Sequence, residues 1–146
     1  MYTGFLHLHD TLRWLLLISL LVTLVKYVSG WLGSKHWSKT DNILGVVLTS
    51  LMDLQLLTGL VLYFFLSPVT KLALSDFGAA MKDPGLRFYA IEHFSMMLIA
   101  IVLVHIGRAK SKKATTDQKK FKTAFLFFLI ALALIVAAIP WGRLYF

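Results

Sequence analysis

Four long apolar stretches constrain the fold of this chain more than any other feature of its sequence. Each is near the ~20 residues that an α-helix needs to cross a bilayer. A soluble core would need polar faces between the apolar ones, and these stretches largely lack them. The chain is 58% hydrophobic, above the roughly 45–50% that is typical of soluble domains. We therefore predict an all-α fold with a single integral membrane domain, residues 1–146, and spans at about 5–28, 42–65, 84–106 and 121–139.

The basic residues between the spans predict the orientation of the chain. The first and third loops carry most of the Lys and Arg residues, whereas Lys71 and Lys82 in the second loop are offset by Asp76 and Asp83. The positive-inside rule places the two basic loops in the cytoplasm and both termini outside. We expect an up-down four-helix bundle in the inner membrane, N-out and C-out.

Helix-start signals mark the second loop and its flanks. Asp41 is a candidate N-cap for the second span. Ser67-Pro68 and Asp83-Pro84 each fit an N-cap followed by proline at the first helical position. An apolar stripe between them predicts a short helix that lies in the membrane interface.

Ionisable side chains within the spans are the most unusual feature, because they are costly in hydrocarbon unless they are paired or functional. The first and third spans run in the same direction, so their polar ends share the outer half of the membrane. Asp53 enters from the second span, nearer the middle. We expect these residues to converge, with Asp10, Asp53 and Glu92 in a buried polar network beside His9, Arg13, Arg87 and His93.

One interpretation of this cluster is a b-type haem. The chain has no cysteine, which excludes iron–sulfur clusters and covalent haem attachment. A non-covalent haem needs axial ligands from two sides, and His9 and His93 are the best pair, since spans 1 and 3 are diagonal neighbours in an up-down bundle. Arg13 and Arg87 are candidates to pair with the haem propionates, and Met97 to line the ring.

Two other interpretations stay open. The polar cluster can be a purely structural ion network in a non-catalytic accessory subunit of a larger membrane complex. It can also handle protons, with Asp53, Glu92 and His93 as relay groups. Hydrolytic motifs are absent from the sequence, so any enzymatic role is that of an electron-transfer component and not of a stand-alone enzyme. The net charge of +8 lies in the loops, so we expect the lipid bilayer and other membrane subunits, and no nucleic acid, as partners.

Three segments carry a resemblance to a known family. They are Leu8-His9-Asp-Thr-Leu-Arg13-Trp14, Asp53-Leu-Gln55-Leu-Leu-Thr-Gly59-Leu-Val-Leu-Tyr63-Phe64 and Leu86-Arg87-Phe-Tyr-Ala-Ile-Glu92-His93. The chain resembles the small bacterial four-helix membrane proteins labelled cytochrome b or cytochrome b-like, over nearly its whole length. The resemblance implies a b-type cytochrome of a respiratory electron-transfer system in a bacterial cytoplasmic membrane. It departs from the family pattern at Asp53, where that pattern has a histidine.

Overall fold

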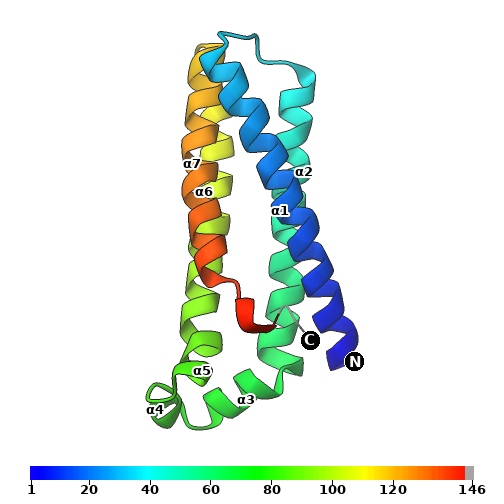
Figure 1. Cartoon of the computed structure of the whole chain (residues 1–146), viewed down its shortest axis with the longest axis vertical. Helices are drawn as coiled ribbons and strands as arrows, with labels where there is room; N and C mark the ends of the chain where they lie inside the picture. The colour runs from blue at the N-terminus through cyan, green and yellow to red at the C-terminus, as the bar shows by residue number, and fades with distance from the viewer. Residues whose placement is uncertain (144–146) are drawn as a thin grey trace.

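The computed structural model describes residues 1–143, and these form an all-α four-helix bundle without strands. Four long helices stand side by side, and short helices cross one end (Figure 1). Their bounds are α1 Tyr2–Leu32, α2 Lys39–Val61, α3 Pro68–Ser75, α4 Phe77–Ala80, α5 Pro84–Arg87, α6 His93–Lys113 and α7 Asp117–Ala138. Two π-helical turns, Leu62–Leu66 and Phe88–Glu92, join α2 to the second loop and α5 to α6.

The four continuous apolar helices run Tyr2–Leu32, Lys39–Leu66, Pro84–Lys113 and Asp117–Ala138, each long and apolar enough to cross a bilayer. They exceed the predicted spans mainly where helix continues past the apolar run into basic sequence. Large apolar side chains such as Ile18, Val25 and Leu57 stay exposed on the outer faces of the helices. Such an apolar exterior suits lipid and not water, so the fold indicates a multi-pass membrane protein.

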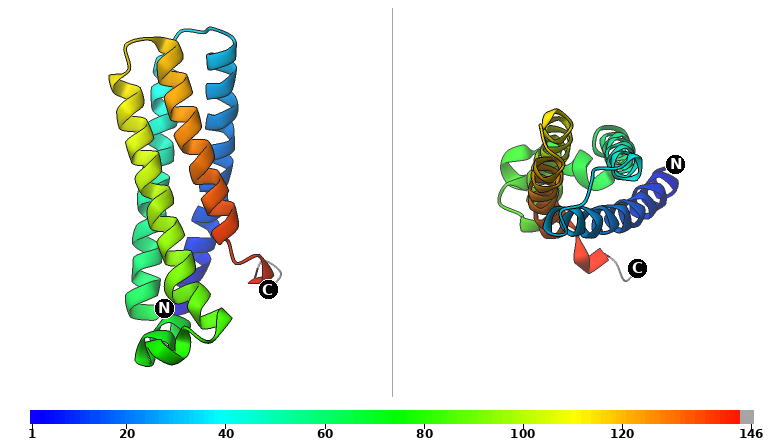
Figure 2. Two further views of the ribbon diagram at one scale, coloured as in Figure 1. Left: turned by 90° about the vertical axis from the view of Figure 1, so that its left-hand side faces the viewer. Right: turned by 90° about the horizontal axis from the view of Figure 1, so that it is seen from above.

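The helices are arranged in the order α2, α1, α7, α6 around the bundle, with α1 and α6 on one diagonal (Figure 2). The N-terminus, the short turn Trp141–Arg143 and α3–α5 lie at one end, which we call the cleft end (Figure 1). The opposite end, which we call the basic end, carries the two short connections at residues 33–38 and 114–116. The diagonal placement of α1 and α6 is the arrangement that the sequence predicts for spans 1 and 3.

Local capping explains where most helices begin. Ser67 and Asp83 accept hydrogen bonds from the backbone amides of Thr70 and Leu86, with proline next in the chain, as predicted. The start of α2 differs from the prediction. Ser38 is its N-cap, and Asp41 is the third helical residue, whose carboxylate accepts from the Ser38 amide at 2.8 Å. The pair forms a reciprocal capping box, in which Asp41 acts from the third helical position instead of the N-cap position that the sequence predicts.

Aromatic packing closes the basic end. The rings of Tyr27 and Phe128 stack with centroids 5.8 Å apart, and Trp37 packs on Phe121 at 4.9 Å. The Tyr27 hydroxyl donates to the Asp41 carbonyl oxygen at 2.6 Å. Because this end is filled with buried aromatic and aliphatic side chains, the open space in the bundle lies at the other end.

Candidate functional site

A cleft opens between the helices in the half of the bundle that contains the N-terminus and α3–α5. Its enclosed part measures about 150 Å³, and the atom-free space is about 1170 Å³ when the open mouth is included. Buried apolar side chains, among them Leu16, Met52 and Ile101, form its floor toward the basic end. Polar side chains on its walls come from α1, α2, the two π turns and the start of α6, and they include His9, Asp10, Arg13, Gln55, Tyr63, Tyr89 and His93.

His9 is held against α2 by its ring nitrogens. Nδ1 lies 3.1 Å from the Thr58 hydroxyl oxygen, and that hydroxyl already donates to the carbonyl oxygens of Leu54 and Gln55. When the single hydroxyl proton of Thr58 goes to one of these carbonyls, the oxygen accepts from Nδ1 of His9, and a neutral ring then has its lone pair on Nε2. The Gln55 amide nitrogen donates to that Nε2 at 3.3 Å. Gly59 permits this approach, since a Cβ there would lie 3.2 Å from Cε1 of His9.

His93 shows the same pattern from the other diagonal helix. Its Nδ1 donates to the backbone carbonyl oxygen of Ala138 at 2.7 Å. A carbonyl can only accept, so Nε2 of the neutral ring again carries the lone pair. A metal-binding imidazole typically has its second nitrogen fixed in this way by a carbonyl or similar partner. Both histidines of the cleft are thus oriented by protein groups through Nδ1.

The two imidazole rings lie close together, with centroids 6.5 Å apart and planes at 68°. With metal–nitrogen bonds of about 2.0–2.1 Å, two imidazoles on opposite sides of one metal place their ring centroids about 6 Å apart. No group of three or more His, Asp or Glu side chains within residues 1–143 can hold a metal ion by itself. A metal here would therefore need ligands from a bound group as well as from the two histidines.

Arg13 and Gln55 leave polar atoms unsatisfied in the wall of the cleft. Arg13 pairs with Asp10 through Nη1 at 3.0 Å, and its side chain is only 12% exposed. Its Nε and the Oε1 of Gln55 are buried without a hydrogen-bond partner. Buried polar atoms rarely remain unpaired, so one donor and one acceptor in this wall are available to a ligand.

Of the other two residues predicted to contact a haem, one lies in the cleft and one lies outside it. Met97 lines the cleft, as expected of a residue beside a ring. Arg87 does not line it. Its Nε donates to Oε1 of Glu92 at 2.8 Å, and both side chains are about two-fifths exposed. A π turn separates the two residues by five positions, and this spacing brings them to the same side of the chain.

The expected convergence of Asp10, Asp53 and Glu92 in one buried network is not what the structure shows. Asp10 pairs with Arg13, Glu92 with Arg87, and Asp53 with His105, so three separate pairs replace the network. Asp53 lies on the outer surface of the bundle, where Oδ1 accepts from Nε2 of His105 at 2.7 Å. The position of Asp53 along its apolar run predicts that it lies near the middle of the membrane. The run has few polar residues, so its periodicity does not predict which face of α2 carries Asp53.

Several groups that shape the cleft were not identified from the sequence. The sequence does contain a signal for Thr58. Thr58 precedes Gly59, a residue that permits close helix contact, and its hydroxyl can bond the carbonyl oxygen of Leu54 four residues earlier. The Ala138 carbonyl is a backbone group 45 residues from His93, and no sequence signal points to it. Tyr63 donates its hydroxyl to the Ala90 carbonyl oxygen at 2.8 Å, and this contact to another segment also has no signal in the sequence.

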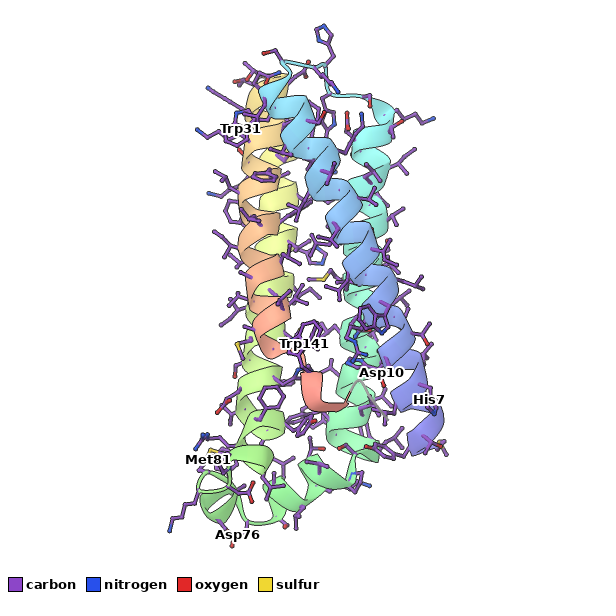
Figure 3. The ribbon with its side chains drawn as sticks, viewed as in Figure 1. His7, Asp10, Trp31, Asp76, Met81 and Trp141 are labelled. Carbon is purple, nitrogen blue, oxygen red and sulfur yellow. The ribbon has the colours of Figure 1, made fainter. Side chains whose placement is uncertain are left out.

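Figure 3 shows Asp10 in the cleft-end half of α1 and Trp31 at the far end of the same helix. The polar wall of the cleft and the aromatic packing thus occupy opposite halves of the bundle. No family model matches the chain, and no curated protein or solved structure matches it either.

Proposed function

We propose that this chain is a small membrane cytochrome of the b type that binds one haem between α1 and α6. The observation that carries the proposal is the separation of the His9 and His93 rings, 6.5 Å between centroids, on diagonally opposed helices. Haem bound there would supply one-electron redox chemistry. The chain would serve as an electron-transfer component and not as a stand-alone enzyme.

The donor set of the cleft fits a haem. In the neutral tautomer that donates through Nδ1, each imidazole has its lone pair on Nε2, as bis-histidine ligation requires. The unpartnered Nε of Arg13 suits a propionate, because an arginine can bind a carboxylate with two nitrogens. Met97 would contact the ring. Arg87 is occupied by Glu92 and lies outside the cleft, so the two arginines predicted as propionate partners are reduced to one.

The size of the cleft sets a condition on this proposal. Its enclosed part of about 150 Å³ equals a cavity that takes a benzene-sized ligand, so a macrocycle must also occupy the open mouth. The amide of Gln55, which now donates to Nε2 of His9, must turn away for that nitrogen to ligate. Gln55 Oε1 has no partner to lose in this movement.

Membrane placement follows from the distribution of charge. Lys and Arg side chains such as Lys35, Lys110 and Lys120 gather at the basic end, which the positive-inside rule puts in the cytoplasm of a bacterial cell. The cleft would then open in the outer half of the cytoplasmic membrane. A single redox centre must receive and pass on electrons, so other membrane subunits are the expected partners.

The test is an optical one. Protein purified from haem-replete cells should give a reduced-minus-oxidised b-type haem spectrum, and His9→Ala and His93→Ala should each abolish it, because each removes one axial ligand. His7→Ala is the matched control, since His7 is exposed two residues from His9 and should leave the spectrum intact. A folded but colourless wild-type protein would refute the proposal and leave the accessory-subunit interpretation standing.

A further inference from the structure

The Asp53–His105 pair lies on the outside of a bundle whose exterior is otherwise apolar around it. Asp53 is 55% exposed and His105 is 46% exposed. Their exposed neighbours include Val46 and Leu57 on α2 and Val102 on α6. We call this surface the α2–α6 face and define it by these five residues together with Ser50.

The pair also lies deep along its helix. Asp53 stands fourteen residues after Lys39 and thirteen before Leu66, in the middle of the continuous helix Lys39–Leu66. At 1.5 Å per residue, it is about 20 Å from either end. Ionisable side chains at such depth almost always face a protein interior or a water-filled cavity. An Asp–His pair that faces lipid at this level therefore calls for a covering protein surface.

We propose that a second copy of this chain covers the α2–α6 face, in a two-fold symmetric dimer whose axis runs along the membrane normal. The two copies of any residue then lie at the same depth. Each pair thus meets an identical pair, whereas an unrelated partner would need its own polar group at that level. Two-fold symmetric dimers are the commonest oligomers, and their interfaces are self-complementary.

The pair is self-complementary in its hydrogen-bonding atoms. The bond within one copy uses Nε2 of His105 and Oδ1 of Asp53. When His105 is protonated, its Nδ1–H is left as a donor, and the carboxylate of Asp53 has Oδ2 left as an acceptor. Rotation about the two-fold axis places α2 of one copy opposite α6 of the other, so that Asp53 meets the partner's His105. The two carboxylates and two imidazoliums form a closed, neutral ring of charges shielded from lipid.

Cysteine cross-linking in native membranes tests the contact without altering the pair. The chain has no native cysteine, so a single Ser50→Cys variant carries the only thiol. A short bis-maleimide, which alkylates one thiol at each end, should link two copies through it. Leu21→Cys is the control, because Leu21 is 51% exposed on α1 and lies eleven residues from its helix end at Leu32, as Ser50 does from Lys39. Leu21→Cys should not cross-link.

Mass measurement tests the role of the pair. Wild-type protein in lipid nanodiscs or mild detergent should have twice the 16.5 kDa mass of the chain. Asp53→Leu/His105→Leu should weaken dimerisation by about tenfold or more, since interhelical polar contacts contribute modestly each but occur twice here. His36→Leu/Asp117→Leu removes the other His–Asp pair, at 3.1 Å in the basic end, and should leave the dimer intact.

Three results would overturn the proposal: a monomeric wild-type protein in both media, Ser50→Cys cross-linked only to a different protein, or a double-leucine variant that dimerises as tightly as the wild type. The haem spectrum is independent of this outcome, because neither Asp53 nor His105 lines the cleft. Failure of the dimer and failure of the cytochrome proposal are therefore distinguishable. Asp53→Leu/His105→Leu should keep the helix content and the haem spectrum of the wild type. A monomer mass for this variant then reflects lost dimerisation and not unfolding.

Discussion

Gly59 controls how closely α2 approaches His9. A Cβ at this position would lie 3.2 Å from Cε1 of the ring, so any larger side chain must push the imidazole out of its place. Gly59→Leu should lower haem content by about tenfold or more, since overpacking typically costs about 1–3 kcal/mol.

The measurement is the haem-to-protein ratio of purified protein. Gly4→Leu provides the control, because a Cβ at Gly4 would have no heavy atom within 4 Å. An undiminished ratio in Gly59→Leu would show that the position of the His9 ring does not limit binding.

Single residues also show where sequence reasoning succeeds and where it stops. His9 and His93 were chosen from helix direction and depth alone, and the structure brings their rings together. Asp53 was expected beside them and instead faces outward with His105. Depth follows from counting along an apolar run, but orientation needs periodicity, and a helix that is apolar on nearly every side offers little of it.

At the scale of elements, the two π turns are the least predictable feature. Their extra residue leaves carbonyl groups in need of donors, and side-chain hydroxyls supply them. Thr70 donates to the Tyr63 carbonyl oxygen at 2.7 Å, and Tyr63 donates to that of Ala90 at 2.8 Å. These partners come from different segments of the chain. Helix starts at Ser67 and Asp83 were predictable because each cap is a local pattern.

Close contact between α6 and α7 depends on a small residue. A Cβ at Gly107 would lie 2.4 Å from Cβ of Phe127, an atom that cannot move without the helix backbone. Gly107→Leu should therefore force the two helices apart and lower the melting temperature by at least about 5 °C.

Thermal unfolding in detergent, followed by circular dichroism, measures this change. Ala133→Leu adds the same side chain at an exposed position of α7 and should have little effect. Equal melting temperatures for the two variants would mean that the α6–α7 contact at Gly107 is not a tight one in solution.

The whole molecule has a charge asymmetry that predicts its orientation. Thr115 lies in the basic third loop, and Lys82 lies in the second loop between α4 and α5. On intact cells, a membrane-impermeant maleimide should label Lys82→Cys and spare Thr115→Cys until the cells are opened. Labelling of Thr115→Cys alone would reverse the topology and place the cleft on the cytoplasmic side.

The four-helix architecture could be predicted because it depends on the length and number of apolar runs, which are properties of the sequence alone. The position of the cleft could not be predicted from the sequence. The cleft forms because α1 and α2 carry polar side chains and Gly59 at the cleft end of the bundle. The aromatic cluster of Tyr27, Trp37 and Phe121 fills the half at the basic end. Which half fills and which stays open depends on packing across all four helices.

The aromatic closure of the basic end makes the cleft a blind pocket. Leu16, Met52 and Ile101 end it partway along the bundle, and beyond them buried side chains continue to Phe121 and Trp37. A ligand held in the cleft is therefore separated from the basic end by closely packed side chains. Polar side chains deep in one half of the bundle thus coexist with a sealed other half.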